Sequence, residues 1–544
     1  MLIKEIVIEN FRCFKNITIE LEQLSILVGE NGVGKTSILE AINYGLSPYF
    51  LSSRLNSSDF SFKTEDPFTI SLYFDETFNA TLPDGWTTQD IPCNGISLAA
   101  KKRQKATAGK AFSDGYTTSH YLIPDITHPS IRKIDEDKWS IPRKSSDSQP
   151  FNFTSRSLIV GNVESTNLPR CFYFDKNREN QSKIGFNSTL QKISDDFNWR
   201  FRNKLPEIKA DFLAHWNKLY ELIINNVGDK QIKSTIKPLK TKLKEILGDK
   251  FENLELSLIL LEEPFSKSFF SIREGIHQLE KSNLGSGISM ILTVVFLDII
   301  SNLSKEKLTI LIDEPELHLH PQLQEILYKY FAASDNQIIF TTHSENFIDI
   351  SGWKGIKRLD HNFNVYPTDT ELEEVLIYKG NQQTVQQNLE DLTKYYYDKS
   401  TLIKEQNRIM FAKKCLIVEG PIEKYCFDIL PSKNGYDFKY CTIVCAYGKE
   451  KIKNLQLLCK AFGIPFFTVF DLDNKTIEDD ENKAIIDFSF EGDYYHFTDS
   501  FETILGTKNH QYKTSESMKR IENIDKLPTE ISELFDLVKK FNEK

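Results

Sequence analysis

The chain has 544 residues, of which 40% are hydrophobic and 26% are charged, and its formal net charge is -10. This length exceeds what one compact core usually serves, so we expect about two or three domains. The acidic balance excludes a broadly basic nucleic-acid coat, and any nucleic acid must be bound through local basic patches or bound cations.

Cysteine usage and hydropathy predict a protein of a reducing, aqueous compartment. The eight cysteines are scattered from Cys13 to Cys459 without a CxxC pair, which disfavours a zinc site or a disulfide framework. The N-terminal segment lacks the long apolar run of a secretory signal. The longest apolar run, residues 288–300, is interrupted by Asp298 and is too short to span a bilayer. We therefore expect a cytoplasmic protein without a membrane segment.

The chain opens with two strand patterns and a helix pattern. Residues 2–9 alternate, residues 24–29 form a second apolar strand, and residues 35–46 have helical spacing. Between the second strand and the helix, GENGVGKT fits G-x-x-x-x-G-K-[ST], whose glycines let backbone N–H groups approach phosphates at a helix N-terminus. We expect ATP phosphates to contact this loop, with Thr36 also binding Mg²⁺, through the following residues: Asn31, Gly32, Gly34, Lys35, Thr36 and Ser37.

The next 200 residues are less regular. Residues 100–160 contain a basic run and a Ser-rich stretch, and we interpret them as surface loops, with solvation of the basic run favoured over phosphate contact. Residues 188–247 are helical by period, with breaks at Pro206 and Gly228. They predict a helical insertion at about 185–250, and their many apolar side chains predict a two-fold homodimer contact.

Two short apolar strands follow the insertion, and each ends in polar residues. The first, LTILIDEPE, ends in paired carboxylates, so we expect Asp313 to orient Mg²⁺ and Glu314 to polarise the attacking water. The second, IIFTTHS, ends at His343, which we expect to contact the γ-phosphate. This pattern is typical of parallel strands whose carboxyl ends line a binding site.

Residues 381–413 predict a helical linker, and the alternating strands and helices from residue 414 predict a second, smaller α/β domain. Glu419 lies at the end of one predicted strand, with Glu423 on the helix that follows it. Asp471 and Asp473 lie at the end of a later predicted strand. Carboxylates at the ends of adjacent parallel strands converge and repel, which raises their pKa values. Bound Mg²⁺ or Mn²⁺ relieves that repulsion and serves phosphodiester hydrolysis.

The nucleotide motifs together resemble the ABC ATPase family, and IENFRCF, GENGVGKTS, DEPELHLHP and THS are similar to its RecF/SMC/OLD branch. The resemblance implies a head-to-head dimer in which the partner's signature loop completes each P-loop. Ser286 and Gly287 of LGSGIS are the signature candidates, and Ser289 stands where glutamine is usual, which bears on ATP turnover more than on binding. By the same resemblance, His318 and His320 lie at the dimer seam.

The C-terminal region resembles the Toprim domain, and VEGPIEKY, YGK and VFDLD are similar to the OLD (overcoming lysogenization defect) family, close to its Gabija-type and retron-associated nucleases. The resemblance implies that Glu419 and Asp471 are catalytic and that a later acidic element lies at Ser500 and Glu502. It also implies a C-terminal lysine that stabilises charge at the phosphate, for which Lys513 is the candidate, with Lys508 and Lys519 as alternatives. The implied metal ligands are Glu419, Glu423, Asp471, Asp473 and Glu502.

The sequence therefore predicts an α/β protein with an ABC ATPase at 1–380, a linker at 381–413 and a Toprim domain at 414–544. We expect an ATP-regulated, Mg²⁺- or Mn²⁺-dependent DNA endonuclease, and by resemblance a role in anti-phage defence. An ATP-gated DNA-binding platform with an inert Toprim fold is the alternative, whereas no DNA-gate domain of a topoisomerase fits the remaining length. Family members act alone, with a helicase-like protein, or with a retron reverse transcriptase and its RNA–DNA hybrid, and the sequence leaves these open.

Overall fold

The computed structural model describes most of the chain outside its middle section. The described residues are 1–46, 51–61, 66–84, 87–102, 115–141, 150–153, 168–176, 241–242, 245, 272–274, 277–279, 286–304, 307–378, 381–399, 404–490, 492–507 and 513–544. Of the predicted helical insertion at 185–250, only residues 241, 242 and 245 are among them. The insertion and the homodimer contact predicted for residues 188–247 therefore lie outside the described residues.

Two compact units make up the chain. The first comprises Met1–Leu27 and Gly34–Phe347, and the second comprises Val28–Val33 and Ile348–Lys544. The division falls at residue 347, so residues 348–380, which we predicted to belong to the ATPase domain, pack with the second unit. The six residues Val28–Val33, which include most of the P-loop, also pack with the second unit.

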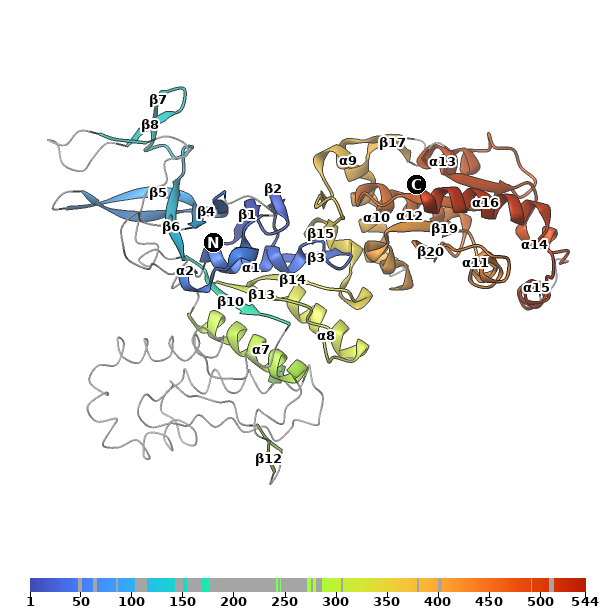
Figure 1. Cartoon of the computed structure of the whole chain (residues 1–544), viewed down its shortest axis with the longest axis horizontal. Coiled ribbons are helices and arrows are strands. Elements are labelled where there is room, and N and C mark those ends of the chain that lie inside the picture. The colour runs from blue at the N-terminus through green and yellow to red at the C-terminus, as the bar shows by residue number, and fades with distance from the viewer. Residues whose placement is uncertain are drawn as a thin grey trace, which may run out of the picture. The chain divides into compact units, whose positions relative to one another are not determined.

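An antiparallel sheet forms part of the first unit (Figure 1). Its strand order is β2-β1-β4-β5-β6. Along β1 the side chains of Ile6 and Ile8 are buried, whereas Val7 between them is partly exposed and Glu9 after them is exposed, which is the alternation expected from the sequence. The strands are β1 (Ile3–Phe11), β2 (Phe14–Glu20), β4 (Phe68–Asp84), β5 (Thr87–Lys102) and β6 (Tyr116–Pro124).

Our interpretation of residues 100–160 as surface loops was wrong over much of its described part. Strand β6 lies there, and β7 (Arg132–Asp135), β8 (Lys138–Ile141) and β9 (Phe151–Phe153) form a separate three-stranded sheet. All four side chains of β7 are exposed, so the strand carries no alternating apolar signal. Strand β8 does carry it, through the buried Trp139 and Ile141.

A second, largely parallel sheet has the order β10-β13-β14-β3-β15-β16. Its strands are β10 (Arg170–Phe174), β13 (Leu308–Ile312), β14 (Gln337–Thr341), β3 (Leu24–Gly29), β15 (Ile356–Leu359) and β16 (Val365–Tyr366). Every residue of β13 and β14 is buried, as expected for parallel strands covered on both faces. This burial explains why both strands read as continuous apolar runs.

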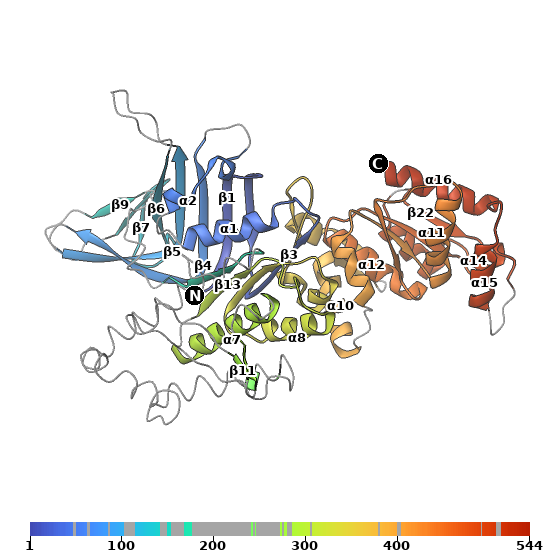
Figure 2. The same ribbon diagram turned by 60° about the horizontal axis from the view of Figure 1, so that its bottom comes forward.

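Helices cover both faces of this parallel sheet. Helix α1 (Lys35–Leu46) contacts β10 and β14 and also reaches β4 and β5 of the antiparallel sheet. At the second contact, Gly45 leaves room for Leu72, since an added Cβ would lie 2.8 Å from its Cδ1. Helices α7 (Ser286–Ser304) and α8 (Pro321–Ala332) lie on the side away from α1 (Figures 1 and 2).

The second unit contains a four-stranded parallel sheet of order β20-β19-β21-β22. The strands are β19 (Lys414–Val418), β20 (Cys441–Cys445), β21 (Phe466–Asp471) and β22 (Tyr494–Phe497). The chain leaves β19 toward β20 on one side and then crosses back to β21 on the other. In open α/β sheets, the carboxyl ends of strands beside such a reversal line the binding site.

The helices of this unit include α11 (Pro421–Lys433), α12 (Lys449–Ala461), α13 (Asp480–Phe488), α14 (Phe501–Ile504), α15 (Lys513–Glu522) and α16 (Thr529–Glu543). Phe427, Phe438 and Phe535 pack together, with ring centroids 5.2–5.9 Å apart, in the core that α11 and α16 share with the sheet. Aromatic packing of this kind fixes α11, whose first turn carries a predicted metal ligand.

The segment predicted as a linker is part of the second unit. It begins with β18 (Asn381–Thr384), which pairs with β17 (Val375–Tyr378), and continues through α10 (Val385–Lys399) and a 3₁₀ helix, η8 (Lys404–Phe411). The buried Val385, Leu389 and Leu392 form an apolar stripe along α10. The segment is thus helical, as predicted, but it packs against its surroundings instead of running free.

Two further expectations concern cysteines and membranes. All eight cysteines are free thiols in the structure. Among the described helices, none has both the length and the apolar character that crossing a membrane requires.

Candidate nucleotide and metal sites

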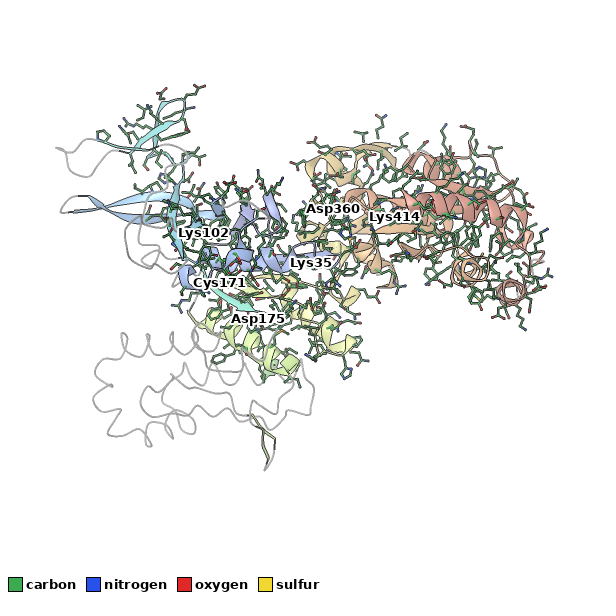
Figure 3. The ribbon with its side chains drawn as sticks, in the orientation of Figure 1. Lys35, Lys102, Cys171, Asp175, Asp360 and Lys414 are labelled. Atoms are coloured by element: carbon green, nitrogen blue, oxygen red, sulfur yellow. The ribbon has the colours of Figure 1, made fainter. Side chains whose placement is uncertain are left out.

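The P-loop has the strand–loop–helix geometry that the motif predicted. Strand β3 ends at Gly29, and α1 begins at Lys35, which is labelled in Figure 3. Gly29, Gly32 and Gly34 have φ angles of 137°, 83° and 98°, a region that side chains disfavour. At Gly34 a Cβ would also lie 2.5 Å from Cζ of Phe14. The glycines therefore allow the turn that directs backbone N–H groups at the start of α1.

The predicted magnesium ligands of the nucleotide site lie together. Asp313 follows β13, is 1% exposed, and accepts hydrogen bonds from Thr36 Oγ1 at 3.1 Å to both carboxylate oxygens. Thr341 Oγ1 donates to the same carboxylate at 2.6 Å. Lys35 is also buried, with 6% exposure. The structure thus places Thr36 and Asp313 next to the end of β14. Ser37 follows Thr36 in the first turn of α1.

Glu314 and His343 lie on the two loops that follow β13 and β14. Glu314 has a φ of 51°, and its N–H donates to Thr341 Oγ1 at 2.9 Å. Burial lowers the pKa of His343, and the charge of Lys35 lowers it further. The neutral imidazole favoured there suits a hydrogen bond to a phosphate, as the predicted role requires.

Glu316 is a residue of this site that the sequence analysis missed. Its carboxylate accepts the N–H of His343 at 2.5 Å and the hydroxyl of Thr342 at 3.0 Å. Burial raises the pKa of Glu316, and the two hydrogen bonds oppose that rise. Glu316 is the third acidic residue of the DEPE motif, and that position was the signal in the sequence that could have identified it. Glu316 fixes the loop that carries His343 against the loop that follows β13.

The signature candidate lies beside the ELHLHP turn of the same chain. Ser286 is the first residue of α7, and its side chain is not among those described. Gly287 is buried, and an added Cβ would lie 2.6 Å from Leu319 Cδ2 and 3.2 Å from the carbonyl oxygen of His318. A larger residue at position 287 would require Leu319 to move. His320 precedes Pro321 at the start of α8. Contact with a partner's nucleotide stays a prediction for all of these residues.

The second site lies at the carboxyl ends of β19 and β21. Glu419 follows β19, and its Oε2 accepts the N–H of Asp471 at 3.1 Å. Glu423 is buried in the first turn of α11, and Asp471 accepts the N–H of Phe501 at 3.2 Å to both oxygens. Glu419, Glu423 and Asp471 are therefore neighbours, as the strand order predicts.

The pKa values of these carboxyls are raised first by burial and then by the charges of neighbouring acidic groups. Burial, followed by the charges of Glu423 and Glu419, raises the pKa of Asp471 to about 8. Burial and the charges of Glu419 and Glu502 raise the pKa of Glu423 to about 7. Burial also raises the pKa of Glu419. Such shifts mean that the site carries more negative charge than its protein surroundings balance.

Ser500 and Glu502, the predicted later acidic element, have different roles in the structure. Glu502, in α14, belongs to the cluster, since its charge acts on both Asp471 and Glu423. Ser500 is the N-cap of α14, and its hydroxyl accepts the N–H of Thr503 at 3.4 Å. The lysine prediction is not tested: Lys513 begins α15, but its side chain is not described, Lys508 is not described, and Lys519 is exposed on α15.

Asp473 and Lys449 complete the site. Asp473 has a φ of 54°, and its Oδ2 lies 2.9 Å from Nζ of Lys449, which also donates to the carbonyl oxygen of Asp471. Lys449 is the last residue of the YGK turn after β20, and that motif was the signal in the sequence that could have identified it. Among the described residues, no three acidic, histidine or cysteine side chains are arranged as a ready metal cage. Their carboxylate oxygens are nevertheless the hard donors that suit Mg²⁺ or Mn²⁺.

Comparisons with known proteins agree with this arrangement. The AAA ATPase domain family matches residues 1–348, and the overcoming lysogenization defect protein-like TOPRIM domain matches residues 410–473. The "OLD nuclease" of Thermus scotoductus is 25% identical, over 87% of this chain and 82% of that protein. "Endonuclease GajA" of Bacillus cereus is 22% identical, over 79% and 67%. The "Old nuclease" of Escherichia phage P2 is 22% identical, over 86% and 76%.

The two family matches cover both candidate sites. The first spans more than half of the chain and includes the P-loop, Asp313 and His343, and the second includes Glu419, Glu423, Asp471 and Asp473. An ATPase domain implies nucleotide binding, and a TOPRIM domain implies use of a divalent metal. The chain belongs to the AAA ATPase domain family and joins that ATPase to a TOPRIM domain of the OLD type.

Proposed function

We propose that the chain is an ATP-regulated DNA endonuclease that depends on Mg²⁺ or Mn²⁺ and acts in anti-phage defence. The observation that carries the proposal is the acidic cluster of the second unit, where Asp471 and Glu423 have strongly raised pKa values. The names of the relatives, two OLD nucleases and one endonuclease, support a nuclease with this site intact. The defence role rests on the resemblance to Gabija-type nucleases.

The acidic cluster defines the nuclease chemistry. The acidic residues of this site would hold the divalent ions, which when bound supply positive charge for an in-line displacement at phosphorus: Glu419, Glu423, Asp471, Asp473 and Glu502. Glu419 ties the ends of β19 and β21 together through the N–H of Asp471. Asp471 in turn is held by the N–H of Phe501. In this proposal Lys513 stabilises the charge that develops on the phosphate oxygens.

The first unit supplies the nucleotide site. Lys35 and the N–H groups of Asn31, Gly32, Gly34 and Ser37 would bind ATP phosphates. Thr36 and Asp313, already within hydrogen-bond distance, would share the accompanying Mg²⁺. Glu314 would orient the attacking water, His343 would contact the γ-phosphate, and Ser286 and Gly287 of a second copy would close the site.

ATP acts in this proposal as a gate on DNA cleavage and not as its motor. Phosphodiester hydrolysis is downhill, so ATP can only shift the population of cleavage-competent conformations, by as much as its affinity differs between them. Part of the P-loop packs with the second unit, where Glu30 Oε2 lies 2.5 Å from Nε2 of His361. This contact supports a route from the nucleotide to the TOPRIM domain.

The test compares Asp471→Asn with Lys35→Ala on supercoiled DNA, with Mg²⁺ or Mn²⁺ and with or without ATP. Asp471→Asn should abolish nicking and cutting while the thermal shift induced by ATP persists. Lys35→Ala should lose that shift and any response to ATP while basal cleavage survives. A wild type that leaves DNA intact with both metals would favour the inert platform. Loss of basal cleavage in a folded Lys35→Ala protein would overturn the gate.

We also infer that the working form is a homodimer or a larger homo-oligomer. The inference rests on the resemblance to ATPases whose nucleotide is shared between two heads. Light scattering at micromolar concentration, with and without ATP, checks it directly. A monomer under both conditions would contradict the inference without touching the assignment of the acidic cluster.

A further inference from the structure

A basic side chain lies inside the acidic site of the second unit. Lys449 is the first residue of α12, and only 7% of its side chain is exposed. Its Nζ donates to the carbonyl oxygen of Asp471 and lies 2.9 Å from Oδ2 of Asp473. The same nitrogen lies 5.9 Å from the centre of the Phe470 ring. Lys449 is therefore held against the last residues of β21 and the turn that follows.

The helix that carries Lys449 does not explain this placement. A cation in the first turn faces the positive end of the helix dipole, which is unfavourable. Burial of an ammonium group is also unfavourable unless anionic partners compensate it. The compensation comes from the acidic cluster: Asp473 pairs with Lys449 directly, and Lys449 also donates to the carbonyl oxygen of Asp471.

The turn before Lys449 is also tied to the site. Gly448 donates its N–H to the carbonyl oxygen of Glu419 at 3.2 Å. Its φ is 135°, and an added Cβ would lie 2.7 Å from the carboxylate oxygens of Glu450, so a side chain is disfavoured here. Gly448 and Lys449 thus connect the turn after β20 to the ends of β19 and β21.

We propose that Lys449 is the resident cation of the TOPRIM site. Its positive charge partly neutralises the acidic cluster when no metal is bound, and it repels a divalent ion that binds there. This inference deepens the proposed function, because it concerns the same carboxylates. Lys449 sets how much Mg²⁺ or Mn²⁺ is needed to fill the site. It acts through Asp473 and the cluster, not on the substrate.

Two effects of removing the charge oppose each other, and their sizes decide the outcome. A unit charge a few Å from a divalent ion changes affinity by about tenfold or more, even at an effective dielectric constant of about 20. Loosening of the Asp473 turn acts in the other direction. That turn keeps two backbone hydrogen bonds, from the N–H of Asp473 to Asp499 and from that of Asn474 to Thr498. Electrostatics should therefore prevail, and the ion should bind more tightly.

The test measures Mn²⁺ binding to the full chain by calorimetry and by electron paramagnetic resonance, without DNA or nucleotide. Every protein carries Asp313→Asn, so that the nucleotide site does not contribute. Lys449→Met should lower the Mn²⁺ dissociation constant by about tenfold. Lys449→Arg, which keeps the charge, should stay within about threefold of the parent. Lys453→Met, one turn further along α12, removes an equal charge and is the matched control.

The results of these binding measurements can contradict the role of Lys449 without contradicting the proposed function, and the reverse also holds. An unchanged or weaker Mn²⁺ affinity in folded Lys449→Met overturns the role of Lys449, and Lys449→Gln replaces that variant if it does not fold. Asp473→Asn should reduce the effect of Lys449→Met, because the pair acts together. A parent protein that binds Mn²⁺ but never cuts DNA would sink the proposed function and leave the role of Lys449 standing.

Discussion

The hydroxyl of Thr36 donates to both carboxylate oxygens of Asp313, at 3.1 Å from each. Thr36 belongs to the first turn of α1, and Asp313 follows β13, 277 residues later in the chain. Thr341 of β14 holds the same carboxylate from the other side. Three neighbouring elements thus position one hydroxyl and one carboxylate, the oxygen ligands that Mg²⁺ accepts beside nucleotide phosphates.

Thr36→Val should separate nucleotide binding from magnesium binding. Valine keeps the shape of threonine but removes the hydroxyl, so the Mg²⁺ that accompanies ATP loses one ligand. We expect the thermal shift with Mg²⁺ and ATP to fall well below that of the wild type, since the stabilisation by a ligand grows with the ratio of its concentration to its dissociation constant. The shift with ATP and EDTA should match the wild type. Equal shifts in both conditions would remove Thr36 from the magnesium site.

Glu316→Ala should impair ATP turnover more than ATP binding. Without the carboxylate, the N–H of His343 and the hydroxyl of Thr342 lose their acceptor, and the loop that presents His343 is no longer fixed. We expect kcat for ATP hydrolysis to fall by about tenfold, with KM changed by less than about threefold. Glu316→Gln keeps one acceptor and should be intermediate. A rise in KM alone would assign Glu316 to binding instead.

Metal binding to the acidic cluster should strengthen as pH rises. The raised pKa values, about 7 for Glu423 and about 8 for Asp471, mean that a divalent ion must displace protons near neutral pH. Between pH 6 and pH 8.5, Mn²⁺ affinity should rise by up to about tenfold per pH unit for each proton displaced, and then level off. Asp471→Asn should flatten this profile, whereas a flat wild-type profile would contradict it.

The same shifts predict the stability of the metal-free protein. Both carboxyls bind protons more tightly when folded than when unfolded, because their folded pKa values lie above the ordinary value near 4. The folded state therefore holds more protons between about pH 4 and pH 8, and the free energy of unfolding should fall as pH rises through that window. Melting in EDTA at several pH values measures this, and added Mn²⁺ should reverse the trend at pH 8.

Much of both sites could be predicted because their motifs are local. The P-loop, Asp313 and the Glu419–Glu423 pair each depend on a few consecutive residues whose strand and helix context is visible in the sequence. Glu316 and Lys449 were missed because their partners come from other strands, such as Asp471, 22 residues from Lys449. Strand β7 was missed because every side chain is exposed, so burial leaves no pattern there.

Arg358, in the core of the second unit, is another residue whose role could not be predicted, because its partners are far away in the sequence. It is 4% exposed and donates to the carbonyl oxygens of Ala412 at 2.9 Å and Phe462 at 3.0 Å, which lie 54 and 104 residues away. Burial lowers the pKa of Arg358, and the charge of Asp360, labelled in Figure 3, opposes that effect. No local pattern distinguishes this arginine from one on the surface.

Arg358→Met should destabilise the second unit by about 2–3 kcal/mol, since it leaves buried carbonyl oxygens without donors. Lys354→Met is the matched control. Lys354 is exposed, and its pairing with Glu390 at 3.6 Å should contribute little. Urea unfolding followed by aromatic fluorescence reports the difference. Equal midpoints for the two variants would show that Arg358 is dispensable for the packing of β15.

The contacts around β15 predict a variant that binds ATP but no longer transmits its effect. Within the second unit, the Leu359 carbonyl packs so closely on Gly29 that an added Cβ would overlap it, and His361 pairs with Glu30 at 2.5 Å. Arg358 joins the same strand to Phe462, just after α12, and α12 begins at Lys449 in the acidic site. A continuous series of contacts therefore runs from the P-loop to the carboxylates.

His361→Ala removes the pairing with Glu30 and leaves the phosphate-binding residues of the P-loop in place. ATP should still raise the melting temperature as in the wild type, because none of its proposed contacts is lost. The effect of ATP on the rate of DNA cleavage, in whichever direction the wild type shows it, should shrink by at least about threefold, a size typical of residues that couple two sites. His128→Ala, in the first unit, serves as the control. An unchanged ATP effect in His361→Ala, with normal binding, would mean that the signal bypasses β15, and ATP would then have to act through the first unit or through a second copy of the chain.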